Sequence, residues 1–297
     1  MQRNAWILFL GVLVALVAAA PAAAVVNGPV VKTVTGQVAI REGKVTEAKV
    51  RCPSTMVAIA GSVVKHPAAS TFRQSLPSGA RTWRFAFGGF VGAASHKATV
   101  NVRCVGLSVP TAAGKVALNV NTVSHGVGVD ALDRAQTRID CRKGYVPTAW
   151  GFDIPAPSTT QGVQPPEELQ VYKALADSRG FAFGLENLGA GGNVARLRVR
   201  CLQRTAAGKA GLSHTWQLTR QRRSQRIRSG VRTVRHSCAS LSLSVGLGHS
   251  IDPADDVIFR RSYDGRTRSA AWVFDNASGT DKVTTQLSCL STSTTFH

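Results

Sequence analysis

Hydrophobic and polar residues alternate with a period of two in short stretches throughout this chain. The alternating hydrophobic positions ahead of three of the cysteines are Val100, Val102 and Cys104; Leu197, Val199 and Cys201; and Val283, Thr285, Leu287 and Cys289. Because successive side chains of a β-strand point to opposite sides, each stretch is predicted to be a half-buried strand. Long amphipathic helical patterns are missing, and the best short helical candidate is 166–176. The pattern therefore predicts an all-β fold.

Six cysteines divide the chain into three similar repeats. They fall into pairs of like spacing, which are Cys52 with Cys104, Cys141 with Cys201 and Cys238 with Cys289. Two aromatic residues with one residue between them precede each second cysteine, at Phe85 and Phe87, Phe181 and Phe183, and Trp272 and Phe274. The repeats run over 27–109, 116–205 and 211–297, and the similar small-residue segments 111–115 and 205–209 join them.

Each repeat has about 85 residues, which is enough for a small β-sandwich with a core of its own. The predicted fold is therefore three tandem, disulfide-closed, β-sandwich-like repeats. The alternative is one pseudo-threefold β-prism in which each repeat supplies one sheet. Gly61, Gly151 and Gly248 lie at similar distances after the first cysteine of their repeats, where a bend or a bulge is expected.

The repeat restricts how the cysteines can pair. If the repeats share a fold, the bonds form either within repeats or between each second cysteine and the first cysteine of the next repeat. We expect bonds within repeats, because each repeat is then closed by itself. On the chain-entropy model each bond contributes about 4 kcal/mol. No CxxC motif and no histidine at a repeated offset accompanies the cysteines, so the pattern does not indicate a metal site.

The first residues indicate the compartment. Arg3 is followed by an apolar run over 5–20 and then by three alanines at 22–24, an order typical of a secretory signal peptide. We expect residues 1–24 to be removed on export, which leaves a mature chain without a transmembrane segment. An uncleaved membrane anchor is the alternative. A secreted or envelope location is oxidising and would allow the six cysteines to form disulfides.

Basic residues outnumber acidic residues by 36 to 16, and no acidic residue lies between Glu186 and Asp252. The arginines of this segment that are predicted to bind a polyanion are Arg196, Arg198, Arg200, Arg220, Arg222, Arg223, Arg226 and Arg228. The first three should project together from one face of a strand, where they repel one another unless an anion lies between them. Teichoic or lipopolysaccharide phosphate, acidic polysaccharide or extracellular nucleic acid could supply that anion. The alternative is a solvated basic surface.

Sequence-specific nucleic-acid binding is not expected, because the aromatic residues occupy core positions of the strands and do not alternate with the basic residues. Catalysis is not indicated either. The histidines share no repeat offset, and HExxH, GxSxG, P-loop and GxGxxG motifs do not occur. The acidic groups at 252–256 and 275–281 are more typical of solvated turns than of calcium sites. We therefore expect a protein that is not an enzyme and that needs no cofactor.

Repeat 1 resembles the tandem cysteine-bracketed β repeats of secreted proteins of actinobacterial type. The features that carry the resemblance are Cys52-Pro53, Gly61, the aromatic dyad and the closing Val102-Arg103-Cys104. A looser likeness is to the vitelline membrane outer layer protein I, a three-unit β-prism. The first resemblance implies an exported, disulfide-closed β domain. The second implies a structural role that faces carbohydrate.

These patterns together predict an exported protein that binds an anionic polymer or another envelope component without catalysis. A lectin-like carbohydrate-binding protein, using exposed aromatic residues and loop carboxylates, is one alternative. A hydrolase whose site is assembled across repeats is another.

Overall fold

The computed structural model describes residues 30–296 except 66, 68–69, 93–94, 107, 112–113, 118, 155–168, 208–211, 241, 253–256 and 267. The predicted signal peptide lies outside the described residues. The described chain is all-β and contains no helix that could cross a bilayer. Its disulfides are Cys52–Cys104, Cys141–Cys201 and Cys238–Cys289, so the prediction of bonds within repeats is confirmed.

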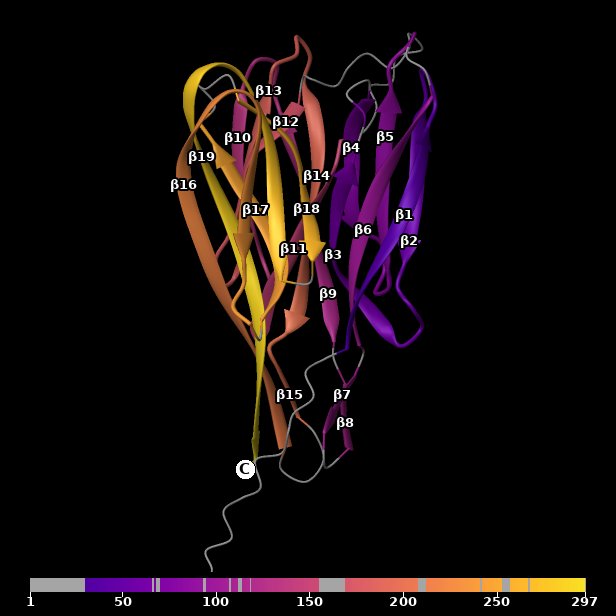
Figure 1. Ribbon diagram of the computed structural model, residues 1–297, viewed down its shortest axis with the longest axis vertical. Helices are drawn as coiled ribbons and strands as arrows, with labels where there is room; N and C mark the ends of the chain where they lie inside the picture. The colour runs from indigo at the N-terminus through magenta and orange to yellow at the C-terminus, as the bar shows by residue number, and fades with distance from the viewer. Residues whose placement is uncertain are drawn as a thin grey trace, which may run out of the picture.

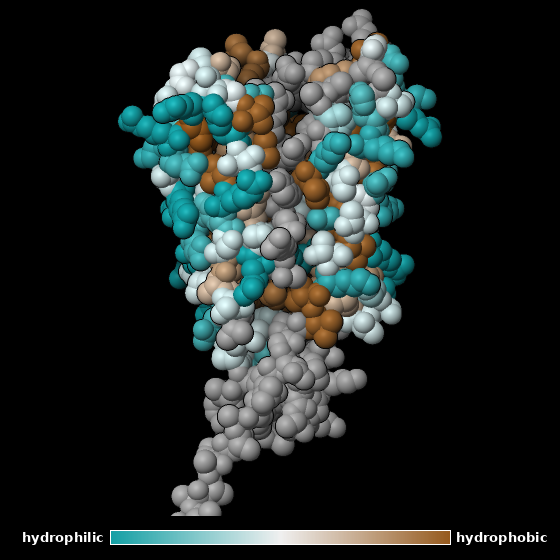
Figure 2. Space-filling view, viewed as in Figure 1, coloured by the Kyte–Doolittle hydropathy of each residue, from teal (hydrophilic) through white to brown (hydrophobic). Residues whose placement is uncertain are grey.

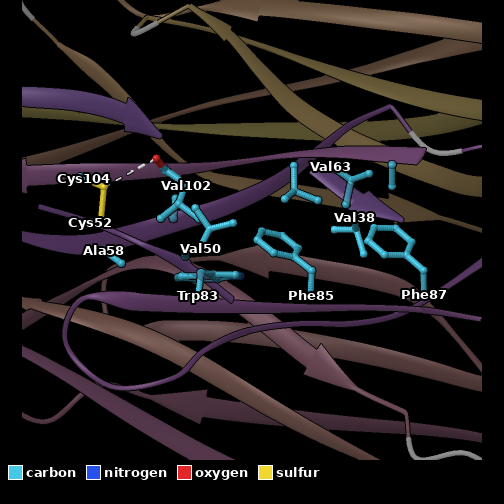
Figure 3. Packing of buried hydrophobic residues seen from close by; sticks show 14 of the residues in the cluster. Val38, Val50, Cys52, Ala58, Val63, Trp83, Phe85, Phe87, Val102 and Cys104 are labelled. Atoms are coloured by element: carbon cyan, nitrogen blue, oxygen red, sulfur yellow. Dashed lines mark hydrogen bonds between the residues drawn. A yellow bond between two sulfur atoms is a disulfide. The ribbon is translucent and has the colours of Figure 1, made fainter. Parts of the chain in front are cut away.

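Repeat 1 is a sandwich of two three-stranded antiparallel layers. One layer has the order β1–β6–β3, made of Val31–Ile40, His96–Gly106 and Met56–Lys65. The other has the order β2–β5–β4, made of Val45–Arg51, Thr82–Gly89 and Ser70–Pro77. The aromatic side chains of β5 point into the core between the layers, toward Val38, Val63 and Val102 (Figure 3). The first disulfide ties the two layers together at one end of this core.

Repeats 2 and 3 have the same two layers. In repeat 2 one layer has the order β9–β14–β11, made of Val120–Val129, Asn193–Gln203 and Tyr145–Asp153. The other has the order β10–β13–β12, made of Arg134–Asp140, Gly180–Asn187 and Leu169–Ala176. In repeat 3 two long strands, β16 (Leu212–Ser237) and β19 (Ser269–Phe296), serve both layers, and β17 (Leu243–Ile251) and β18 (Val257–Arg266) complete them. The segments that join the repeats form the short strands β7 (Ser108–Thr111), β8 (Gly114–Ala117) and β15 (Thr205–Ala207).

The layers continue from one repeat into the next. Strand β4 of repeat 1 pairs with β11 of repeat 2, and β12 of repeat 2 pairs with β17 of repeat 3. Strand β18 lies against β3, so the three repeats close into one pseudo-threefold body (Figure 1). Side chains from all three repeats fill its axis, among them Ile59, Val146 and Val245. Each repeat is thus a sandwich, and the shared sheets join the sandwiches into one body.

Two local expectations change in the structure. The short helical candidate is wrong where it can be seen, because 169–176 forms β12, which pairs with both β13 and β17; the positions 166–168 lie outside the described residues. Gly61 leaves room for the Trp83 ring of its own repeat, whereas the other two glycines allow close approach between repeats. A Cβ on Gly151 would lie 2.2 Å from the carbonyl oxygen of Ser75, and one on Gly248 would lie 2.6 Å from that of Ala174. The bulges themselves lie nearby, for example between Pro147 and Ala149.

Candidate functional site

The strand register makes the three repeats comparable residue by residue. In each repeat one strand pairs with the strand that carries the second cysteine; these strands are β1, β9 and the first half of β16. The residues opposite the cysteines are Lys32 (Cys104), Asn121 (Cys201) and Thr219 (Cys289). Positions at equal distances from these three residues are therefore equivalent. All three strands lie at or near a sheet edge, so they form an internal control for what this place in the fold requires.

Each shared sheet has an outer face that points away from the sandwich cores. The repeat 1–2 face is formed by β2, β5, β4, β11, β14 and β9. The repeat 2–3 face is formed by β10, β13, β12, β17, β19 and the first half of β16. The arginines predicted to form one polyanion site are divided between these faces, since Arg196–Arg200 lie on β14 and Arg220–Arg228 lie on β16.

On the repeat 1–2 face the predicted site is not formed. Arg196 is exposed, but Arg198 is half-buried and donates from Nη1 to the carbonyl oxygen of Pro77 at 3.0 Å. Arg200 is only 2% exposed and donates from Nη2 to the carbonyl oxygen of Gly79 at 2.5 Å. Burial lowers the pKa of Arg200 to about 10. These arginines share one strand face as predicted, but two of them bind the end of β4 and the β4–β5 turn of repeat 1.

The buried arginine recurs in repeat 1. Arg103 precedes Cys104 as Arg200 precedes Cys201, and it is also 2% exposed. Its Nη1 donates to the backbone oxygen of Ser244 and, at 2.6 Å, to the Oγ of the same residue. The third equivalent position is Ser288, which is fully buried. Two of the three repeats therefore use this arginine to hold a neighbouring repeat, which is a structural role.

The repeat 2–3 face keeps its basic side chains at the surface. Arg222 and Arg226 are exposed and lie opposite Gln286 and Lys282 of β19. Arg228 is exposed at the end of the same row. Arg220 is half-buried, and its pKa is lowered chiefly by burial. Arg223 is exposed but alternates to the other side of β16. Hydrophilic residues cover this side of the molecule, at the left of the view (Figure 2).

A groove of about 780 Å³ lies on the repeat 2–3 face, and both repeats line it. Its basic residues are Arg134 and Lys173 of repeat 2 and Arg226 and Lys282 of repeat 3. Arg134 pairs with Glu186 at 2.8 Å. Within the described part of the chain, the other three make no ion pair. Positive charge is therefore available to a ligand along both sides of the groove.

The groove also carries groups that can hydrogen-bond to a sugar. Hydroxyls of Ser250 and Thr284 and the carboxylates of Asp252 and Asp281 line it. Tyr172 lines it as well, and its ring packs over Gly184, where an added Cβ would lie 2.4 Å from a ring carbon. Cations beside hydroxyls and carboxylates suit a ligand that has both negative charge and hydroxyl groups.

On the repeat 2 side of this face, the free positive charge does not extend beyond the groove. Beyond it, Arg138 of β10 pairs with Asp177 at 2.5 Å and with Asp140 at 2.8 Å. The Arg138 guanidinium lowers the pKa of Asp177 well below its usual range. Arg138 is therefore neutralised within the protein. Sequence reasoning missed Lys173 and Lys282, because only the pairing of β12 with β17 and of β19 with β16 brings them beside Arg226.

Other candidate sites are weaker. A cavity of about 30 Å³ near the axis, lined by residues such as Ala60, Trp150 and Leu247, has room for about two water molecules. In the described ranges no group of three His, Cys, Asp or Glu side chains is placed to hold a metal ion. Asn276, in one of the acidic segments, is buried and donates to the carbonyl oxygen of Ile227.

Comparison with known proteins assigns no relative. No protein-family model matches the chain, and no curated protein is significantly similar to it. The function therefore has to be inferred from the geometry of the two outer faces and of the ends of the molecule.

Proposed function

We propose that this protein is exported, acts without catalysis and binds an acidic polysaccharide in the groove of the repeat 2–3 face. The observation that carries the proposal is the set of basic side chains without ion pairs, Lys173, Arg226 and Lys282, around a groove that also presents hydroxyls and carboxylates. Charge attracts the polymer, and the hydroxyls and carboxylates can hydrogen-bond to its sugar rings.

The comparison of repeats supports a role in binding. The position of Arg222 is occupied by Thr35 in β1 and Ser124 in β9, and that of Arg226 by Ala39 and Gly128. Charged residues on edge strands often prevent unwanted strand pairing. Here β1 and β9 occupy the same place in the fold without these arginines, so edge protection is not a sufficient reason for them.

Export is proposed on two further grounds. Three disulfides are typical of proteins in oxidising compartments. The sequence of residues 1–24 has the order of a signal peptide. An acidic polymer of the cell surface or its surroundings would be accessible to a protein exported in this way.

The test is retention on an immobilised acidic polysaccharide, such as polygalacturonate, over a range of salt concentrations. A triple variant with Lys173→Glu, Arg226→Glu and Lys282→Glu should bind at least tenfold more weakly. The slope of its binding constant against salt concentration should fall by the equivalent of about three charges. The matched control reverses Lys32, Lys49 and Arg51, which are exposed on repeat 1. Both variants change the net charge equally.

Equal weakening in the two variants would mean that overall charge drives binding, and the groove would have to be abandoned as the site. Salt-insensitive retention on a neutral polysaccharide would instead favour the lectin-like alternative. Turnover of the polysaccharide by the purified protein would contradict the non-catalytic proposal.

A further inference from the structure

In the part of the chain whose side chains the structure describes, exposed hydrophobic residues gather at one end of the molecule. Val30 lies at the end of the molecule where the C-terminus is found (Figure 1). The others lie at the opposite end, and they are Val45, Val91, Leu132, Leu188, Val194 and Val231. Hydrophobic residues are visible at this upper end in Figure 2. Single exposed hydrophobic residues are ordinary, but a concentration at one end marks an interaction surface.

The end is built in the same way in each repeat. The chain turns a corner from one layer of the sandwich to the other at 41–44, 130–133 and 228–231. A loop of the neighbouring strands binds each corner. In repeat 1, Gly43 donates to the carbonyl oxygen of Gly89, and in repeat 2, Leu132 donates to that of Gly189 at 3.2 Å. We call these three assemblies the corner tips.

Leu132 is the unusual residue among them. It has a φ of 55°, in the left-handed region, and the equivalent corner positions hold Gly43 with a φ of 60° and Gly230 with a φ of 86°. A leucine in this conformation costs roughly 1 kcal/mol relative to glycine. Its side chain is 77% exposed, so it gains little from burial in the fold. The fold alone does not account for a leucine at this position.

The leucine belongs to an apolar patch. Leu188 lies in the loop that binds the Leu132 corner, and Val194 begins the strand beside that corner, opposite Gly128. The side chains are 53% and 52% exposed. Repeat 2 therefore presents the largest apolar tip, and Val91 and Val231 extend the apolar character to the tips of repeats 1 and 3.

The charges around the tips favour an anionic partner. Glu42 accepts a hydrogen bond from the backbone of Gly92, and Asp133 accepts one from the backbone of Arg134. Glu186 pairs with Arg134. In the corners of repeats 1 and 3, the exposed cations Arg41, Lys44 and Arg228 outnumber one carboxylate, Glu42. The corner of repeat 2 instead carries the carboxylates Asp130 and Asp133. Repeats 1 and 3 thus surround their apolar tips with positive charge.

We infer that the corner tips dock on the surface of an anionic lipid bilayer. Apolar side chains at loop tips can enter the headgroup region, and nearby lysines and arginines are attracted to anionic headgroups. The three tips surround the pseudo-threefold axis at one end of the body, so they can meet a flat surface together. The inference does not depend on the groove, because it uses other residues.

The experiment is sedimentation with lipid vesicles. The mature protein should bind vesicles that contain phosphatidylglycerol and bind vesicles of phosphatidylcholine alone more weakly. Leu132→Gly should lower binding about tenfold, because a leucine side chain is no longer buried in the lipid. Leu188→Ser should lower it as well. Val30→Ser, which removes a hydrophobic side chain that is 62% exposed at the other end, should bind as the unchanged protein does.

Leu132→Gly is expected to fold, since glycine is the residue that the other two repeats use, and its melting temperature should be unchanged or higher. It should also keep its retention on acidic polysaccharide, which separates this surface from the groove. Binding by Leu132→Gly equal to that of the unchanged protein would overturn the inference. So would equal binding to both kinds of vesicle, or a variant whose main effect is to convert a dimer into a monomer.

Discussion

The two outer faces occupy equivalent places in the fold and use their basic residues in opposite ways. On the repeat 1–2 face, Arg198 and Arg200 donate to carbonyl oxygens of another repeat. On the repeat 2–3 face, Arg222 and Arg226 remain exposed beside a groove. Alternating arginines in a strand therefore predict which side chains share a face, but not whether that face is open to a ligand.

The neighbouring strand decides the difference. The end of β4 and the turn that follows it bring the carbonyl oxygens of Pro77 and Gly79 within reach of the arginines of β14, which donate charge-assisted hydrogen bonds to them. At the place equivalent to Arg198, repeat 3 has Gln286, which exchanges hydrogen bonds with the backbone of Ala176. A neutral amide meets the same need there, and the arginines of β16 are one strand further out.

The largest expected effect is on stability, at Arg200. Arg200→Ala should lower the free energy of unfolding by about 4 kcal/mol, because it leaves a cavity and removes the donor to the Gly79 carbonyl. Arg222→Ala removes the same charge from the exposed repeat 2–3 face and should lower the free energy of unfolding by less than about 0.5 kcal/mol. Urea unfolding of both variants measures this. Similar losses in both would mean that the two faces are not different in kind.

The sequence predicted the fold better than the site. The alternation toward Cys104, Cys201 and Cys289 indicated the strands, and the repeat indicated the disulfides. Both are local or periodic signals. The burial of Arg200 depends on a turn 121 residues away in the chain, and the groove depends on strand pairing between repeats. Nothing in the spacing of residues specifies such contacts. The sequence does contain the signal for Leu132, since its equivalents are glycines, but only the strand register aligns them.

The second expected effect is on the pH dependence of stability, and it comes from a buried histidine in the sheet beneath the repeat 2–3 face. His249 of β17 is equivalent to Phe152 of β11, since each lies opposite the residue four before the second cysteine. The His249 ring is fully buried and stacks on Phe259 with centroids 3.8 Å apart. Its Nε2 donates to the carbonyl oxygen of Val171 at 2.8 Å, and its Nδ1 has no partner. Burial lowers the pKa of His249 to about 4.

This histidine should make stability fall in mild acid. An unfolded histidine binds a proton near pH 6.5, whereas His249 in the folded protein does so only near pH 4, so protonation favours the unfolded chain between these values. The contribution is about 2 kcal/mol between pH 7 and pH 5, and no further loss occurs below about pH 4. His249→Phe, which introduces the residue of repeat 2, should remove this part of the pH dependence of the melting temperature.

The control is His125→Gln, because His125 is exposed on β9. This variant should keep the pH dependence of the unchanged protein. Buried His214 and His236, whose pKa values are also lowered by burial, are present in both variants and cancel in the comparison. If His249→Phe were as sensitive to acid as the unchanged protein, the pKa of His249 would not be depressed by its surroundings.

The smallest expected effect on stability is the sharpest test of the comparison between repeats. Arg222→Thr and Arg226→Ala together give β16 the residues that β1 has at the equivalent positions, Thr35 and Ala39. Because β1 folds at the same place with these residues, the free energy of unfolding should change by less than about 0.5 kcal/mol. Retention on acidic polysaccharide should nevertheless fall, with a salt slope smaller by about two charges. A stability loss above about 2 kcal/mol would show that the arginines are needed by the fold, and their proposed role in binding would lose its main support.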